Sequence, residues 1–508
     1  MRVLGIAVPG AAPESSAPPV AALIATALAG MAIFAGMATA IVGSTAGYRA
    51  IYYVSVLVIL VAGSVITLTR REPLRFAFLA LIVCFPIAIA ELPPGRFQLT
   101  IFDAVMAALA IGLLWKKISG SATALESLFP TRSFLLACLL IVPCIVFSQY
   151  PLWSLQIFTF KQFTVYVFFL FALDELKREG GFERLVLLLS IVLLVMAAGL
   201  YLDRFLHLSL SMQGSNVNQM TYSDAGVAIY RAGGFFQDPQ KAGAYLACMI
   251  TFLVLLSVRG RFRGMRMCYL VWAAVAFSLG ALMTTIARSA ILACLSVSAI
   301  ALLAFNGWNA AIKLAILGGV LAIAVSLALT PAETWLNVLP VSVSERFQLV
   351  GQDLANRTTI WFDTWDMFAD HPITGIGTGS FQPYLLATRP TISSYYGIGE
   401  SEGMAYIPTD PESGYLKILY ETGILGSLAA LLIVGDAFRQ AIIVMLGTRT
   451  SPAARTEVVA ALAALVTFGV TLVTLYTPAD ERIAALFAVF LAVILRRSLQ
   501  HDPTPQKT

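Results

Sequence analysis

The stretch LVLLLSIVLLVMAAGLYL, residues 185–202, carries no charged side chain. As a helix it would be about 27 Å long, close to the roughly 30 Å of a bilayer's hydrocarbon core. Similar runs recur throughout the 508 residues, of which only 12% are charged, and the mean hydropathy is +0.83. A soluble protein would carry roughly twice that charged fraction. The chain is therefore predicted to be a polytopic membrane protein, which excludes cytosolic enzymes, disordered proteins and secreted disulfide scaffolds.

The predicted fold class is all-α, a polytopic membrane helix bundle of about fourteen spans. The spans are expected at 19–43, 51–69, 74–91, 99–115, 133–149, 157–173, 184–202, 240–257, 267–284, 289–305, 311–329, 415–436, 457–476 and 482–495. They group into a first membrane region, 19–329, and the last three spans, 415–496. Residues 1–18 are rich in proline and read as a disordered lead, and 497–508 as a cytoplasmic tail.

Basic residues indicate the orientation. Clusters at Arg70–Arg71, Lys116–Lys117, Arg259–Arg266 and Arg496–Arg497 all fall on the side that also holds the N-terminus. Loops on the cytoplasmic side of a membrane are enriched in Lys and Arg. Both termini are therefore expected in the cytoplasm, and the alternate loops on the outer side. The net charge of +5 is small for this length and does not suggest a nucleic-acid partner.

Two predicted outer loops are long, about 203–239 and 330–414. A loop as long as the second is usually functional, and it holds ten acidic against three basic residues. The same acidity is also expected without any function, because basic residues are enriched in cytoplasmic loops and outer loops are therefore left with more acidic ones. Within this loop, 356–370 is predicted to form an amphipathic helix, because Trp361, Trp365 and Phe368 recur at helical spacing. Such a helix could lie at the membrane interface or present its indoles to sugars.

Cations on the outer side are informative because orientation bias works against them there. A cation at membrane depth is costly unless it is paired or reaches water. Arg288, Arg231 and Lys417 are interpreted as functional candidates on this ground. Lys161 and Arg482 are instead expected to pair with a nearby acid or to extend to the headgroups.

Two glycine-rich segments accompany these cations. Residues 231–241, RAGGFFQDPQK, combine a cation, glycines and a following helix start, which together allow close approach of an anion. Residues 371–381, HPITGIGTGSF, contain a Gly-x-Gly-x-Gly run. A dinucleotide site would need a preceding strand and a βαβ unit, and neither is indicated. These glycines are interpreted as turn residues, and His371 as structural.

Asp410 and Glu412 stand just before Lys417 and Glu421 in the sequence. Carboxylates near cations at a water-excluded rim suit general-base chemistry. They could equally satisfy a helix N-terminus or bind a divalent cation. None of the six cysteines pairs with a histidine at zinc-like spacing, and the three histidines are scattered. No metal site and no cofactor are predicted.

Four motifs, in order, are similar to those of the O-antigen ligase and polymerase superfamily. They are Arg231-x-Gly-Gly-Phe…Asp238-Pro, Thr285-x-x-Arg288-Ser, Arg357…Trp361…His371-Pro-x-x-Gly375-x-Gly377-x-Gly379-x-Phe381, and Ser413-Gly-Tyr-Leu…Glu421-x-Gly-Ile-x-Gly426. The resemblance covers about residues 200–430, and the last two motifs bracket the large outer loop.

The resemblance implies a GT-C-like glycosyltransferase of the bacterial inner membrane, metal-independent and inverting, with its active site facing the periplasm. Its donor would be a glycan linked to undecaprenyl diphosphate, and its acceptor a second glycan or a lipid-linked acceptor. Other polysaccharide-assembly proteins are further candidate partners, besides the lipid bilayer. By position, Arg231, Arg288 and Arg357 would bind the diphosphate, with Arg346 as a weaker candidate. Lys417 is a further candidate diphosphate ligand because of its membrane depth.

One departure from the ligase pattern bears on the activity. Where ligases have a His-Asn pair with a proposed basic histidine, this chain has Glu412-Ser413. Glu412, with Asp410 as its partner, could take the proton instead. The change favours an exopolysaccharide or O-antigen polymerase over a ligase that transfers glycan to lipid A core. A transporter or flippase for lipid-linked glycan is the rival from another class, although the two halves show no repeat of the kind expected for alternating access.

Overall fold

The computed structural model describes residues 75, 78, 79, 82, 129–206, 220–222, 228–236, 238–259, 261, 265–305, 350–381, 384, 388, 411, 413–447, 450–475 and 480–499. The chain divides into two compact units, Met1–Ala77 and Phe78–Thr508. All described residues except Arg75 belong to the second unit. The predicted spans at 19–43, 51–69, 99–115 and 311–329 lie outside the described residues, as does nearly all of 74–91.

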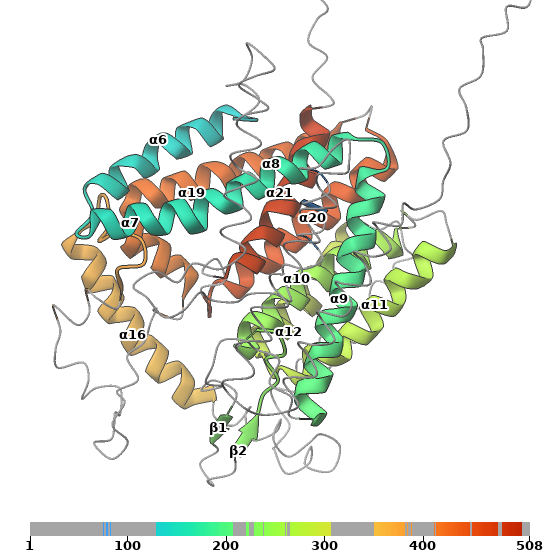
Figure 1. The fold of residues 1–508 in the computed structure, drawn as a ribbon, viewed down its shortest axis with the longest axis horizontal. Coiled ribbons are helices and arrows are strands. Elements are labelled where there is room, and N and C mark those ends of the chain that lie inside the picture. The colour runs from blue at the N-terminus through green and yellow to red at the C-terminus, as the bar shows by residue number, and fades with distance from the viewer. Residues whose placement is uncertain are drawn as a thin grey trace, which may run out of the picture. The chain divides into compact units, whose positions relative to one another are not determined.

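The second unit is helical, as predicted (Figure 1). Its elements are α6 (Arg132–Val146), α7 (Pro151–Ile157), the π-helix η1 (Phe158–Gln162), α8 (Phe163–Lys177), α9 (Gly181–Leu206), β1 (Met220–Tyr222), β2 (Ala228–Tyr230), α10 (Pro239–Val258), α11 (Met265–Thr284), α12 (Arg288–Phe305), α16 (Val350–Asp370), α19 (Gly414–Leu446), α20 (Pro452–Thr471) and α21 (Glu481–Leu499).

Five of the described helices, α9, α10, α11, α19 and α20, are long and apolar enough to cross a membrane. The membrane class is thus supported, while the count of about fourteen spans stays a prediction. The sequence did not predict the antiparallel pairing of β1 with β2, which is in register Met220↔Tyr230 within the loop 203–239. The residues of that loop nearest α9 also continue the helix to Leu206.

Helix α10 forms the centre of the bundle and packs against α9, α11, α12, α20 and α21. Its buried residues include Ala242, Gly243 and Ala247, and those of α20, which packs against it, include Ala460 and Ala464. Small side chains let membrane helices approach closely and pack well. The inside of the bundle is therefore held by close backbone packing.

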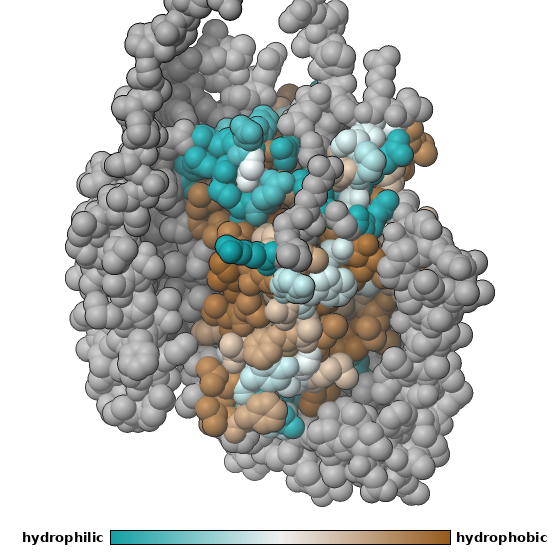
Figure 2. Space-filling model, turned by 90° about the vertical axis from the view of Figure 1, so that its right-hand side faces the viewer, coloured by the Kyte–Doolittle hydropathy of each residue, from teal (hydrophilic) through white to brown (hydrophobic). Residues whose placement is uncertain are grey.

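The outside of the bundle is apolar, as a lipid-facing surface must be. Large hydrophobic side chains on α6, α11 and α19 are exposed, among them Leu139, Tyr269 and Leu431. Figure 2 shows hydrophobic residues gathered below a hydrophilic cap on one face of the molecule. Soluble proteins rarely expose contiguous apolar surface of this kind, so this surface supports the membrane prediction.

The long helix α19 is broken at Gly423, where φ is 63° and ψ is −162°. The segment from the end of α16 fills the break: the N–H groups of Ile376 and Gly377 donate to the carbonyls of Tyr420 and Glu421, both at 2.9 Å. In the other direction, the N–H of Ile424 donates to the carbonyl of Pro372 at 2.9 Å. These bonds satisfy backbone groups that the break would otherwise leave unpaired in an apolar setting.

Several chain segments meet at one end of this unit, which we call the site end. Helix α20 finishes there, and its Leu472 carbonyl accepts the N–H of Gly414, at the start of α19, at 2.7 Å. The loop before α10 also lies there, because the Arg482 guanidinium at the start of α21 donates to the Phe235 carbonyl at 2.8 Å. Arg261 marks the opposite end, where it pairs with Glu183 and Glu457.

Candidate functional site

The loop that carries Arg231 is fixed by a buried carboxylate from α9. Asp203 accepts the N–H groups of Gly233 at 2.8 Å and Gly234 at 2.7 Å. The Tyr230 hydroxyl donates to the same carboxylate. Gly234 has a φ of 57°, and a Cβ there would approach Leu200 to 3.1 Å. The glycines therefore let the loop bend closely over the end of α9, and the Arg231 backbone has a defined position.

This loop is bonded to the turn between α11 and α12. The N–H of Ala232 donates to the Thr284 carbonyl at 3.2 Å, and the Arg231 Nε donates to the Thr285 carbonyl at 3.3 Å. The turn leads directly into Arg288, the first residue of α12. The structure thus brings the Arg231 segment beside the backbone turn that precedes Arg288, although the two motifs are far apart in the sequence.

The turn itself is strained. Ile286 has a φ of 53°, the only positive φ of a non-glycine residue among those described. A β-branched residue rarely adopts this conformation, and such strain occurs preferentially at functional sites. The turn packs tightly on α10, where a Cβ on Gly243 would come within 2.6 Å of the Ala287 Cβ. This tight packing against a core helix holds the unusual backbone in place.

A second group of residues surrounds the break in α19. Gly375, Gly377 and Gly379 have φ values of 71°, 113° and 72°, so they are turn residues, as the sequence predicted. A Cβ on Gly377 would lie 2.4 Å from the Ser154 Oγ of α7. His371 contacts the Gln149 side chain at 3.3 Å and the Tyr384 ring edge-on. These contacts fit the structural role expected for His371.

Lys417 and Glu421 face each other in this second group. Their charged atoms are 3.9 Å apart and both side chains are buried. Glu421 also accepts the Gly379 N–H at 2.9 Å and the Tyr420 hydroxyl at 3.2 Å. The carboxylate therefore joins α19 to the glycine-rich segment. Lys417, which the sequence suggested as a diphosphate ligand, has a buried acid as its neighbour.

Replacing Glu421 tests this link. We expect Glu421→Ala to lower stability by about 3–5 kcal/mol, because it removes a buried carboxylate beside Lys417. Glu421→Gln keeps an acceptor for the Gly379 N–H and should lose roughly half as much. Thermal unfolding of the purified protein in detergent measures both. Equal losses for the two variants would show that the hydrogen bond to Gly379 contributes nothing.

The structure describes the other predicted site residues only in part. Asp410, Glu412 and Arg346 lie outside the described residues, and of Arg357 only its place in the backbone of α16 is described. Trp361 is half-buried, and Trp365 is 53% exposed with its ring in tilted contact with that of Phe368. Helix α16 spans Val350–Asp370 and packs against α19. The roles predicted for these side chains remain predictions.

Sequence reasoning missed the charged residues that hold the site end together. Asp203 lies where the apolar run of α9 ends, and a carboxylate at that depth was a usable signal. Asp480 lies just before Arg482 and accepts its Nε at 2.8 Å and its Nη2 at 2.7 Å. Burial alone would raise the pKa of Asp480, but Arg482 and the nearby Lys241 outweigh it and hold that pKa below its usual range. Asp480 is therefore charged at neutral and mildly acidic pH.

No group of three or more His, Cys, Asp or Glu side chains capable of holding a metal ion occurs in the described part of the chain. The carboxylates proposed as alternative cation ligands, Asp410 and Glu412, are outside that part. The described site residues that could face an anion are mainly guanidinium groups, since the N–H groups of Ala232, Gly233 and Gly234 are bonded within the protein. Guanidinium groups bind anions well, and their geometry matches that of phosphate oxygens.

The fold and site define an integral membrane protein in which a loop carrying the buried Arg231 is bonded to the turn before the half-buried Arg288, at one end of the helix bundle. Residues 273–431 match the protein family described as O-antigen ligase. This match confirms the resemblance to the O-antigen ligase and polymerase superfamily. It includes Arg288, α16 and the broken part of α19, whereas Arg231 lies before it. No curated protein matches the chain.

Proposed function

We propose that the protein is an inner-membrane glycosyltransferase that polymerises or transfers oligosaccharide linked to undecaprenyl diphosphate, at the periplasmic face. The proposal rests on the bonding of the buried Arg231 guanidinium to the turn that leads into Arg288. The family match to residues 273–431 supports the same class of activity. Arg357, on α16, is the third proposed diphosphate ligand, with Arg346 as a further candidate.

The proposed reaction follows from the chemistry of the leaving group. An acceptor sugar hydroxyl attacks the anomeric carbon from the face opposite the diphosphate, so the configuration inverts. The C–O bond to the diphosphate breaks, and undecaprenyl diphosphate leaves with the bonding electrons. Arg231 and Arg288 stabilise the charge that develops there, because fixed guanidinium groups in a low-dielectric site are preorganised for it.

The hydroxyl proton needs an acceptor, and we assign that role to Glu412, with Asp410 as its partner. The neighbour of Glu412, Ser413, is buried, and Gly414 is bonded to the end of α20 at the site end. A carboxylate in such a place can act as base when its surroundings raise its pKa toward the working pH. Glu421 is a less suitable base, because Gly379, Tyr420 and Lys417 surround its carboxylate.

Between the two activities of the family, we favour polymerase, because Glu412-Ser413 stands where ligases have His-Asn. Lipid-linked glycans that accumulate in a deletion strain would decide. We expect single repeat units on the carrier, which is the result for a polymerase. Full-length polymer retained on the carrier would instead indicate a ligase. If the accumulated glycan is found only on the cytoplasmic face, the protein is a transporter and the proposal is wrong.

A further inference from the structure

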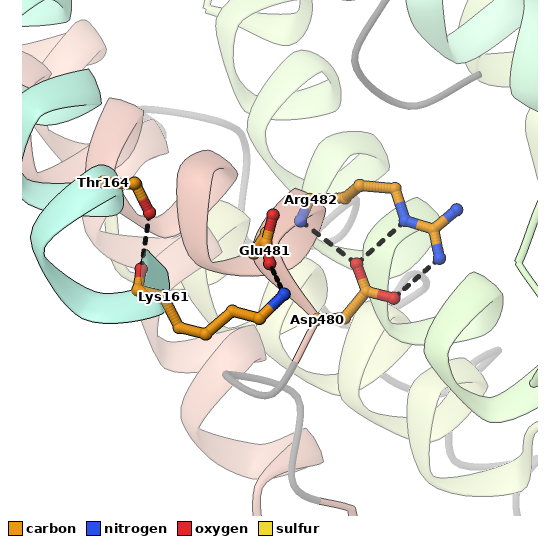
Figure 3. Close-up of polar contacts among 5 residues, drawn as sticks. All are labelled: Lys161, Thr164, Asp480, Glu481 and Arg482. Carbon is orange, nitrogen blue, oxygen red and sulfur yellow. Dashed lines mark hydrogen bonds and ion pairs between the residues drawn. The ribbon is translucent and has the colours of Figure 1, made fainter. Parts of the chain in front are cut away.

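Three consecutive charged residues at the start of α21 bond to two other parts of the bundle. We call Asp480, Glu481 and Arg482 the α21 clasp (Figure 3). Glu481 pairs with Lys161, which is on the π-helix η1. Arg482 pairs with Asp480 and reaches the loop before α10. All three clasp residues are buried. The sequence predicted that Lys161 and Arg482 would either pair with a nearby acid or extend to the headgroups, and the structure shows the acid pairing for both.

Arg482 uses its whole guanidinium group. Two nitrogens bond to the two oxygens of Asp480, and the Nη1 donates to the Phe235 carbonyl at 2.8 Å. The guanidinium carbon also lies 3.7 Å from the centre of the Phe236 ring, as in a cation–π contact. One side chain thus contacts both the backbone and a ring of the loop that carries Arg231.

Only arginine can make this set of contacts. Lysine keeps the positive charge, but it has a single nitrogen and no planar fork, so it cannot bond to both carboxylate oxygens and the carbonyl in this geometry. A buried ion pair is by itself weak evidence for stability, since its desolvation cost offsets its attraction. The bond from Arg482 to the Phe235 carbonyl gives this ion pair a role beyond stability, because it fixes the position of the loop that carries Arg231.

Two elements hold the loop. From α9, Asp203 accepts the N–H groups of Gly233 and Gly234, and the Phe235 ring lies where a Cβ on Gly199 would come within 2.4 Å of it. From the start of α21, Arg482 donates to the Phe235 carbonyl and contacts the Phe236 ring. Arg231 is only four residues before Phe235. Its guanidinium position therefore depends on both anchors.

We propose that Arg482 is a positioning residue for the transfer reaction: it holds the 231–236 loop so that Arg231 is placed beside the turn before Arg288. Arg482 itself does not touch the reacting atoms. This inference rests on the proposed function, since it assigns Arg231 to the diphosphate. The clasp would then couple the start of the last helix to the affinity for the lipid-linked donor.

The test compares Arg482→Lys with Glu481→Gln in the full-length protein in nanodiscs. Glu481→Gln weakens the other pairing of the clasp, with Lys161, and leaves the contacts of Arg482 in place. Backbone hydrogen exchange in residues 231–236 reports the loop directly. We expect exchange at Gly233 and Gly234 to rise at least tenfold in Arg482→Lys and less than twofold in Glu481→Gln. Unchanged exchange in Arg482→Lys, or an equal rise in both variants, would overturn the inference.

A kinetic comparison then separates positioning from a general loss of structure. We expect Arg482→Lys to lower kcat/KM for undecaprenyl-diphosphate-linked donor about tenfold, through both a higher KM and a lower kcat, because Arg231 is assigned both to the bound diphosphate and to the charge that develops on it. In an Arg231→Lys background the same change should add less than twofold, because effects that act through one group are not additive. Fully additive effects would contradict positioning through Arg231. If the parent protein transfers no glycan at all, the proposed function fails, while the exchange result still decides whether Arg482 holds the loop.

Discussion

Replacing Arg288 with alanine is expected to lower glycan transfer at least about 100-fold while the protein still inserts into the membrane. Arg288 begins α12 directly after the strained turn at Ile286. If its guanidinium stabilises the departing diphosphate, its loss removes a preorganised charge from the transition state, an effect of about 10²–10³-fold in comparable sites. Polymer formation in a deletion strain that carries the variant, with protein level measured in the membrane fraction, gives the result.

Arg439→Ala provides the matched control for this experiment. Arg439 lies far along α19 from the site end, its side chain is 63% exposed, and it pairs with Asp436. The Asp436 carboxylate is buried, so this variant can lose some stability, but because the pair lies far from the site end, activity per folded protein should stay within about twofold of the parent. Normal glycan levels in Arg288→Ala would refute the diphosphate role of Arg288. Equal losses in both variants would indicate a general effect of removing arginine.

The second large effect is expected at the break in α19. Gly423→Ala should sharply reduce the yield of folded protein, because a Cβ there would meet the Ile373 carbonyl oxygen at 2.3 Å and the Gly375 nitrogen at 2.6 Å. The backbone at Gly423, with φ of 63° and ψ of −162°, is accessible almost only to glycine and adds about 1–3 kcal/mol for a residue with a side chain. The glycine-rich segment would have to leave the break, and its hydrogen bonds with α19 would be lost. Monodispersity and Tm in detergent measure the loss.

Gly435→Ala in the same helix is the control for the break. A Cβ on Gly435 meets nothing within 4 Å, and its φ is not in the left-handed region. Alanine is favoured over glycine in a helix by about 1 kcal/mol, so this variant should be as stable as the parent or slightly more so. A Gly423→Ala variant that unfolds at the parent's Tm would show that α19 is continuous and that the segment packs elsewhere.

Apolar runs in the sequence predicted the positions of most of the described helices. A membrane helix is apolar along its whole length, both where it packs against other helices and where it faces lipid. The run near 184–202 became α9 and the run near 240–257 became α10. The run near 415–436 was predicted to end too early, since α19 continues to Leu446. Hydropathy also gave no sign of the break at Gly423. Glycine is common in continuous membrane helices, and only the pairing with 372–377 distinguishes this one.

For the site, the type and order of residues in the sequence pointed to the candidate arginines. The sequence did not show which residues those side chains and their loops bond to. The motifs pointed to Arg231 and Arg288, and the loop and turn that carry them are hydrogen-bonded to each other. The sequence did not predict that Asp203 and Arg482 hold the 231–236 loop, because tertiary packing brings these residues to the loop from distant parts of the sequence. Lys417 was assigned to the diphosphate from its depth alone, and the facing carboxylate of Glu421, one helical turn away, was given no part in the site.

Binding of undecaprenyl diphosphate to the purified protein tests most directly whether these arginines hold a diphosphate. The parent protein should bind the diphosphate more tightly than undecaprenyl monophosphate. Arg231→Lys and Arg288→Ala should each weaken diphosphate binding about tenfold or more, since a hydrogen bond to a charged group contributes about 1.5–3 kcal/mol. Arg439→Ala should bind as the parent does. Equal affinity of the parent and both site variants for the diphosphate would contradict the account.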